Sequence, residues 1–176
     1  PALTAANIEV SVQAMFDDAT LALRYQLGRY GLLTLIRCFW HRISALIKRN
    51  RFDIVWIEKE ALPWLPLWFE RRLLSNTPYV LDYDDAVFHH YDRHRLAAVR
   101  LLYGKRIDGL MANAALVVCG NDYLAQRAVE AGPPLVEQLP TVIDLDRYIL
   151  GDQPRSEIPR VVWIGSPSTV KYLDLL

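Results

Sequence analysis

Four short apolar runs in this sequence each end in polar residues. The runs cover residues 52–57, 79–81, 116–119 and 161–164. They are rich in β-branched and aromatic residues and mostly unbroken by polar ones, which predicts strands of a parallel sheet that is covered on both faces. Ligands of open α/β sheets bind beyond the carboxyl ends of the strands. The polar residues that end or follow the runs are therefore the candidate site: Glu58, Asp82, Asp84, Asp85, Gly120, Asn121, Gly165 and Ser166.

Helical patterns separate these runs. Residues 32–51 carry apolar positions along one helical face, and residues 61–75 predict a helix with Pro63 in its first turn. The other expected elements are strands at 8–12 and 136–139 and helices at 20–27, 95–111 (with a break at Gly104) and 121–131. Strands that alternate with helices indicate βαβ units with right-handed crossovers. We therefore expect an α/β protein with a doubly wound, Rossmann-like parallel sheet.

Two domains are expected. Residues 1–150 would form an N-terminal Rossmann-like domain, the polar segment 151–159 a linker, and residues 160–176 the start of a second α/β domain. The sequence begins at Pro1 within a helical pattern and ends at Leu176 soon after another helix starts. We therefore expect a fragment, with the first domain incomplete at its N-terminus and the second domain truncated.

Composition narrows the choice of partner and compartment. The chain has 176 residues, and 52% of them are hydrophobic, which is enough for a buried core. Its 20 basic and 20 acidic residues balance, so no nucleic-acid partner is expected. No signal peptide or membrane span is visible, and the two cysteines show no metal or redox spacing. These features predict a cytoplasmic protein.

The acidic segment after the second run is compatible with three chemistries. Asp82 and Asp84 would share one face of an extended segment, where two carboxylates can hold a divalent cation, as in the metal motif of one class of glycosyltransferases. The same pair resembles the nucleophile motif of haloacid-dehalogenase-type phosphatases. Alternatively, Asp84 or Asp85 acts as a base or positions an acceptor without metal. A loop that merely caps strand and helix ends also fits the pattern.

Two histidines lie in the same loop. His89 and His90 follow the carboxylates closely, a combination that suits metal binding or proton transfer. Neighbouring side chains of an extended segment point in opposite directions, so at most one of them would face a cleft. An exposed histidine without a role is the commoner case, and neither residue is assigned to the site.

The segment after the fourth run predicts an anion site. Gly165 would make a turn, Ser166 and the residues after it would cap a helix, and Lys171 lies one turn further on. This order directs backbone N–H groups and the positive end of a helix at an anion, and Lys171 adds a charge suited to phosphate. The segment matches neither the G-x-G-x-x-G fingerprint nor a Walker loop. An ordinary capped helix is the alternative interpretation.

These segments together resemble a glycosyltransferase of the GT-B fold, in the class called glycosyl transferases group 1 or family 4. Residues 52–56 are similar to the family's "yDvV" strand, and residues 78–85 lie where members often have an apolar strand ending in His-Asp. Residues 115–124 resemble the strand and "S-x-x-L" helix start. Residues 139–148 resemble "iPNGvDldrF", and residues 161–173 resemble the opening of the donor-side domain. The resemblance covers nearly all of the chain, and the order of the segments is its specific feature.

The resemblance implies a reaction and a set of roles. A sugar would pass from a nucleotide-sugar to a hydroxyl acceptor in a cleft between two domains, with no metal or other cofactor required. The roles implied are diphosphate binding by Gly165, Ser166 and Lys171, catalysis at Asp84 and Asp85, and lining of the cleft by Glu58 and Asn121. The family's E-x7-E donor segment would lie beyond Leu176, so the 176-residue chain on its own is expected to be inactive.

Two other functions remain open at this point. One is a Mg²⁺-dependent phosphatase or phosphotransferase that uses Asp82 and Asp84. The other is a non-catalytic α/β binding module, docked on a membrane-bound partner. The basic helix at 37–51 and the aromatic residues between 64 and 69 are compatible with peripheral contact to anionic lipid. A glycosyltransferase with a lipid-linked acceptor would make the same contact at the inner face of the membrane.

Overall fold

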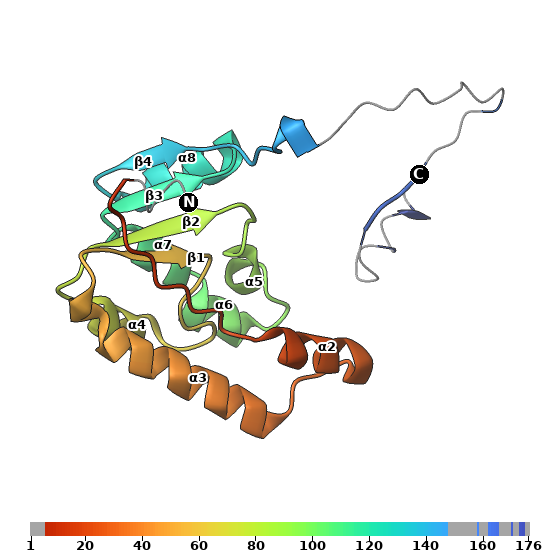
Figure 1. Cartoon of the computed structure of the whole chain (residues 1–176), viewed down its shortest axis with the longest axis horizontal. Helices are drawn as coiled ribbons and strands as arrows, with labels where there is room; N and C mark the ends of the chain where they lie inside the picture. Colours follow the sequence, from red (N-terminus) through yellow and green to blue (C-terminus); the bar gives the residue numbers. More distant parts are fainter. Residues whose placement is uncertain (1–5, 148–157, 159–161, 166–169, 171–172, 175–176) are drawn as a thin grey trace. The chain divides into compact units, whose positions relative to one another are not determined.

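The computed structural model describes residues 6–147, 158, 162–165, 170 and 173–174. The chain divides into two compact units, Pro1–Thr141 and Val142–Leu176. Of the elements in the described residues, every strand and all the α-helices belong to the first unit (Figure 1). The candidate site is therefore described within the first unit, and the second unit is described by itself.

A four-stranded parallel sheet forms the centre of the first unit. Its strands are β1 (Val55–Glu58), β2 (Tyr79–Tyr83), β3 (Leu116–Cys119) and β4 (Val136–Gln138), in the spatial order β1-β2-β3-β4. The register pairs Glu58 with Asp82, and Asp82 with Val118. The predicted α/β class with a parallel, Rossmann-like sheet is confirmed.

Helices connect these strands. The elements before β1 are α2 (Asp18–Leu27), α3 (Leu32–Ile47) and the 3-10 helix η1 (Arg49–Arg51). The connecting helices are α4 (Leu67–Leu74) between β1 and β2, then α5 (His89–Asp92), α6 (Ala97–Tyr103) and α7 (Arg106–Met111) between β2 and β3, and α8 (Asp122–Ala131) between β3 and β4. In Figure 1, α3 and α4 lie below the sheet. The alternation of strand and helix is the βαβ arrangement that the sequence predicts.

The hydrophobic core lies on one face of the sheet. Side chains of this face, among them Ile57, Leu81 and Val117, belong to one buried cluster with residues of α4, α7 and α8. Val80 and Val118 point to the other face and are buried, but they do not belong to that cluster. Right-handed crossovers between strands in sequential order place their helices on one face. The described sheet is therefore wound in one direction only.

The strand predicted at residues 8–12 does not form, so that prediction is wrong. Alternation favours a strand only where a neighbouring strand supplies hydrogen bonds, and in the described part of the chain the sheet begins at β1. The apolar side chains of Ile8, Val10 and Val12 are exposed. Residues 162–164, predicted as part of a strand, form none either, and residue 161 lies outside the described residues.

Proline shortens the helix predicted at residues 61–75. Residues 61–66 form turns and bends, and α4 begins directly after Pro66. Proline lacks an N–H donor and disfavours the helical conformation in the residue before it. Because Pro63 and Pro66 stand close together, the segment between β1 and α4 becomes an irregular loop beside the candidate site.

Local end signals located α8 correctly. The side chain of Asn121 accepts a hydrogen bond from the backbone N–H of Leu124 at 3.0 Å, which is an N-cap. Gly132 ends the helix in the left-handed conformation with φ of 84°. In contrast, His89 and His90, which were predicted to lie in a loop, belong to the short helix α5.

Candidate functional site

Polar residues gather at one edge of the sheet. Glu58 is the last residue of β1, Asp84 and Asp85 follow β2, and Asn121 follows β3. The carboxyl ends of parallel strands meet at the same edge, so these four predicted site residues lie along it. Backbone hydrogen bonds continue past the strands there: the N–H of Lys59 donates to the carbonyl of Asp82 at 2.9 Å.

Lys59 lies between the two carboxylates that were predicted to be catalytic. Its Nζ is 3.1 Å from Asp84 Oδ1 and 3.0 Å from Asp85 Oδ2. Partial burial lowers the pKa of Lys59, but the hydrogen bonds and charges of Asp85 and Asp84 outweigh it and raise the pKa above its usual value. The carboxylate side chains remain 52% and 73% exposed, so a ligand in solvent can reach them.

The backbone around Lys59 is in a costly conformation. Lys59 and Trp64 have φ angles of 63° and 65°, in the left-handed region that side chains other than glycine rarely adopt. Such residues persist where surrounding contacts over-determine them, and they cluster at functional sites. The loop between β1 and α4 contains both.

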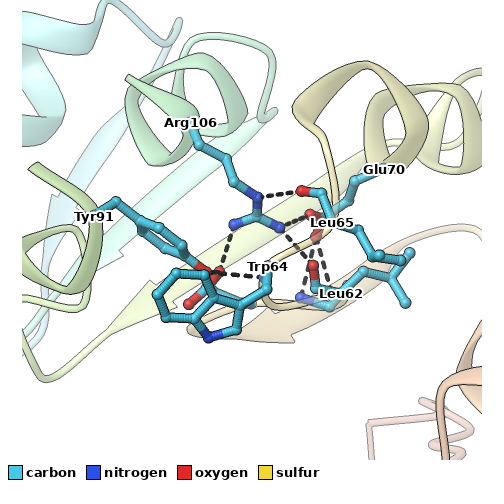
Figure 2. Close-up of polar contacts among 8 residues, drawn as sticks. Leu62, Trp64, Leu65, Glu70, Tyr91 and Arg106 are labelled. Atoms are coloured by element: carbon cyan, nitrogen blue, oxygen red, sulfur yellow. Dashed lines mark hydrogen bonds and ion pairs between the residues drawn. The ribbon is translucent and has the colours of Figure 1, made fainter. Parts of the chain in front are cut away.

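A buried ion network holds this loop. The guanidinium of Arg106, from α7, forms ion pairs with Glu60 and Glu70 (Figure 2). It also donates to the backbone carbonyls of Leu62 at 2.7 Å and Leu65 at 2.8 Å. The side chain of Arg106 is only 1% exposed. All these contacts except that with Glu70 are made to the loop itself.

Two carboxylates share this one guanidinium. Glu70 is fully buried and accepts hydrogen bonds from the backbone N–H groups of Ala61 and Leu62, each at 3.2 Å. Burial raises the pKa of Glu70 to about 7, although the Arg106 charge opposes the shift. Glu60 accepts a further hydrogen bond from the hydroxyl of Tyr91 at 2.7 Å. The network fixes the loop that presents Lys59 at the edge of the sheet.

Gly120 and Asn121 follow β3 and lie beside the acidic segment that follows β2. The N–H of Gly120 donates to the carbonyl of Tyr83 at 2.8 Å, and a Cβ at Gly120 would lie 3.5 Å from the Cα of Asp84. The end of β3 therefore lies directly beside the predicted catalytic segment. The side-chain oxygen of Asn121 is occupied by its capping bond to the backbone N–H of Leu124.

The carboxylates of the D-x-D segment have different partners. Asp82 Oδ2 accepts a hydrogen bond from the indole N–H of Trp56 at 3.2 Å, whereas Asp84 pairs with Lys59. In the part of the chain that the structure describes, no group of three or more His, Cys, Asp or Glu side chains is arranged to hold a metal ion. Among the described residues, the two carboxylates therefore do not share a partner.

The residues that were predicted to bind the diphosphate of the sugar donor belong to the second unit. Gly165 is described and lies outside any helix or strand. Ser166 and Lys171, which were predicted to bind diphosphate, lie outside the described residues. The described residues 145–147 form the short 3-10 helix η2 (Leu145–Arg147).

Sequence reasoning missed the residues that build the loop. Lys59, Glu70 and Arg106 belong to no motif that the sequence pattern singles out. The sequence gives no clear signal for Glu70 or Arg106, because another charged residue stands directly beside each of them. Which charges pair across the fold cannot be read from spacing along the chain.

A hollow lies at the opposite edge of the sheet. Its volume is about 580 Å³, and it is lined by residues that precede the strands, among them Ser75, Asn76 and Asn113. Arg71 donates a hydrogen bond to Asn113 there at 2.9 Å. Ligands of parallel sheets bind at the other, carboxyl edge. The hollow provides an internal comparison for any experiment that locates a ligand.

Comparisons with protein-family models, curated proteins and solved structures found no match to this chain.

Proposed function

We propose that this chain is the acceptor-side part of a glycosyltransferase, which transfers a sugar from a nucleotide-sugar to a hydroxyl group of an acceptor. The finer architecture belongs to the same proposal: a doubly wound GT-B domain of which the described sheet is one half. The support from sequence is the order of the segments that resemble this class. The support from structure is the polar edge of the parallel sheet.

One observation carries the proposal: Lys59 Nζ lies 3.1 Å and 3.0 Å from the carboxylates of Asp84 and Asp85 at the carboxyl edge of the sheet. Exposed carboxylates accept hydrogen bonds from sugar hydroxyls, and an ammonium group donates to hydroxyl oxygens. The three groups can thus exchange their mutual contacts for contacts with one polyhydroxylated ligand. In the proposed reaction Asp84 and Asp85 position the acceptor hydroxyl, and Glu58 and Asn121 contact the acceptor from the ends of the neighbouring strands.

The donor is proposed to bind through the second unit. Gly165, Ser166 and Lys171 would hold the diphosphate of the nucleotide-sugar by backbone N–H groups and one positive charge. Stabilising the departing nucleoside diphosphate is the main electrostatic task in such a transfer. This assignment is supported by the sequence pattern strand, glycine turn and capped helix.

Binding of glycosides to the 176-residue chain tests the proposal. A panel of methyl glycosides and oligosaccharides would be titrated by saturation-transfer NMR and calorimetry. Replacing both carboxylates (Asp84→Asn with Asp85→Asn) should lower the affinity for the glycoside that binds about 10- to 100-fold, because hydrogen bonds to charged groups are lost. Asp53→Asn is the matched control, since Asp53 is an exposed carboxylate just before β1, at the opposite end of that strand.

The two variants separate the outcomes. Weakening by the double variant with unchanged binding by Asp53→Asn supports the proposed acceptor site. If no glycoside binds, or if binding is indifferent to both carboxylates, the proposal fails.

Contact with a membrane surface is a second proposal, and α3 is the observation that favours it. One side of α3 packs on the core through Phe39, Ile43 and Leu46. A second apolar stripe, Leu33, Ile36, Trp40 and Ile47, is exposed. Exposed basic residues lie beside this stripe at positions 37 and 48. This combination suits adsorption to anionic lipid. No helix in the described residues is long and apolar enough to cross a bilayer.

A further inference from the structure

A chain of short hydrogen bonds lies at the same edge of the sheet and has no role in the site described so far. His89 Nε2 is 2.6 Å from the hydroxyl oxygen of Tyr123, and His89 Nδ1 is 2.7 Å from Asp92 Oδ1. His89 and Asp92 belong to α5, which follows β2, and Tyr123 lies in the first turn of α8, which follows β3. The three residues thus come from the connections that leave the carboxyl ends of the two central strands.

Asp92, which contacts the imidazole, has a basic partner of its own. Asp92 Oδ2 is 3.4 Å from Arg127, whose guanidinium also binds Asp108 at 2.8 Å and 3.1 Å. Burial lowers the pKa of Arg127, but the hydrogen bond to Asp108 and the nearby carboxylate charges outweigh it and raise the pKa. In the neutral imidazole with its hydrogen on Nδ1, that hydrogen is donated to Asp92 Oδ1, and Nε2 presents a lone pair to the Tyr123 hydroxyl.

The lone pair of Nε2 is covered by a side chain that is itself accessible. Tyr123 is 53% exposed, and the side chain of His89 is 22% exposed. Tyr79, a tyrosine of the core, differs in both respects: it is only 5% exposed, and its hydroxyl donates to a backbone carbonyl. The Tyr123 hydroxyl marks a position where a hydroxyl lies within hydrogen-bond distance of His89 Nε2 and where a ligand can arrive from solvent.

We propose that His89 Nε2 is the base that receives the proton of the acceptor hydroxyl, with Asp92 orienting the imidazole and the Tyr123 hydroxyl occupying the acceptor position until a substrate displaces it. This inference rests on the proposed function and names the base that the reaction needs. The ligand class is a hydroxyl group of a carbohydrate.

The proposed step balances as follows. The proton of the acceptor hydroxyl passes to His89 Nε2, and the acceptor oxygen forms a bond to the anomeric carbon of the donor sugar. The bond from that carbon to the diphosphate oxygen breaks, and its electron pair leaves with the nucleoside diphosphate. Asp92 stabilises the imidazolium, which then returns its proton to solvent. His89 contacts the substrate, whereas Asp92 and Tyr123 are positioning residues.

Chemical modification of individual histidines tests the inference without any need for turnover. Diethyl pyrocarbonate reacts with the lone pair of neutral imidazole, and peptide mass spectrometry gives the rate at each histidine. Tyr123→Phe removes the hydroxyl that covers Nε2 and should raise the rate at His89 about fivefold, the equivalent of one hydrogen bond. The rates at His90, which is exposed, and at His94 are internal references and should not change.

Ligand protection completes the test. A methyl glycoside that binds the chain should lower the rate at His89 but not at His90. Tyr123→Ala, which uncovers the imidazole further, should raise the rate at least as much as Tyr123→Phe. Thermal unfolding of each variant verifies that it is folded.

The outcomes distinguish this inference from the proposed function. An unchanged rate at His89 in both Tyr123 variants overturns the inference, even if glycosides bind at Asp84 and Asp85. A glycoside that binds there without protecting His89 also overturns it and leaves the proposed function standing. A third outcome is that His89 is modified faster in both variants and is protected by a simple polyol such as glycerol but by no glycoside. This outcome supports His89 as a base for a hydroxyl group and contradicts sugar transfer.

Discussion

Two tyrosines on the same face of β2 differ in how their hydroxyls are satisfied. The hydroxyl of Tyr79 donates to the carbonyl of Leu110 at 2.7 Å. The hydroxyl of Tyr83 is buried and has no hydrogen-bond partner among the described residues. Burial raises the pKa of Tyr83, so the group stays a neutral phenol. A buried polar group without a partner costs about 1–3 kcal/mol.

Phenylalanine should therefore have opposite effects at the two positions. Tyr83→Phe removes an unsatisfied group and should raise the free energy of unfolding by about 1 kcal/mol, whereas Tyr79→Phe loses a hydrogen bond and should lower it by about 1 kcal/mol. Urea unfolding of the two variants and the wild type measures both changes. A clear loss of stability in Tyr83→Phe would show that its hydroxyl has a partner.

Glu70 makes stability depend on pH. Its pKa is raised from 4.5 to about 7 by burial. Folding then favours the protonated form, so this contribution is complete below about pH 4.5 and is lost as the pH rises to about 7. Glu70→Gln mimics the protonated form. Its stability relative to wild type should rise by roughly 1–3 kcal/mol over that interval.

Chemical unfolding at a series of pH values measures this difference. The exposed Glu137→Gln is the control and should run parallel to the wild type. If the Glu70→Gln curve is also parallel, Glu70 keeps an ordinary pKa in the fold.

At the scale of single residues, the sequence revealed site residues that end or follow strands, but not Lys59, which directly follows β1. Asp84, Asp85 and Asn121 were found because strand ends are visible as the ends of apolar runs. Lys59 and Arg106 were missed because their partners come from other elements. A tertiary ion pair leaves no periodic trace along the chain.

At the scale of elements, α3 shows a feature that its sequence period alone does not resolve. The predicted apolar face included Leu32, Ile36 and Ile47, which the structure leaves exposed, while Phe39 and Ile43 pack on the core. A helix that is apolar on more than one face packs one apolar stripe on the core and leaves a surplus apolar stripe exposed. In α3 this surplus lies beside basic residues.

The proposed lipid contact of α3 predicts a specific loss. Trp40→Glu places a charge in the middle of the exposed stripe and should lower binding to vesicles of mixed neutral and anionic lipid about tenfold or more, because a tryptophan can no longer be buried. Co-sedimentation measures the binding, which should also weaken with salt.

Leu101→Glu is the matched control for this experiment. Leu101 is 86% exposed, but it belongs to α6. Equal loss in both variants, or no vesicle binding by the wild type at low salt, would contradict a membrane role of α3.

Element boundaries were predictable where their signals are local. The limits of β3 and α8 follow from an apolar run, an Asn cap and a glycine end. The loop at residues 61–66 was mispredicted because its apolar residues suggest a helix, and the conformation is decided by two prolines and by Arg106 from a distant helix. The strand predicted at residues 8–12 does not form because a strand needs a neighbouring strand to supply its hydrogen bonds.

At the scale of the whole molecule, the sequence predicted the parallel sheet and its polar edge. The described sheet is wound in one direction and has its hydrophobic core on one face. On the other face, the side chain of Trp56 is 57% exposed. The two units, Pro1–Thr141 and Val142–Leu176, have their own internal contacts, and the site described in detail belongs to the first.

We propose that the carboxyl edge of this sheet binds a carbohydrate ligand. Backbone amide NMR of the 176-residue chain, titrated with the glycoside that binds it, locates the ligand directly. The amides of Lys59, Asp85 and Asn121 should shift together with one saturation curve. Shifts confined to the opposite edge, at Ser75, Asn76 and Asn113 in the hollow there, would contradict it.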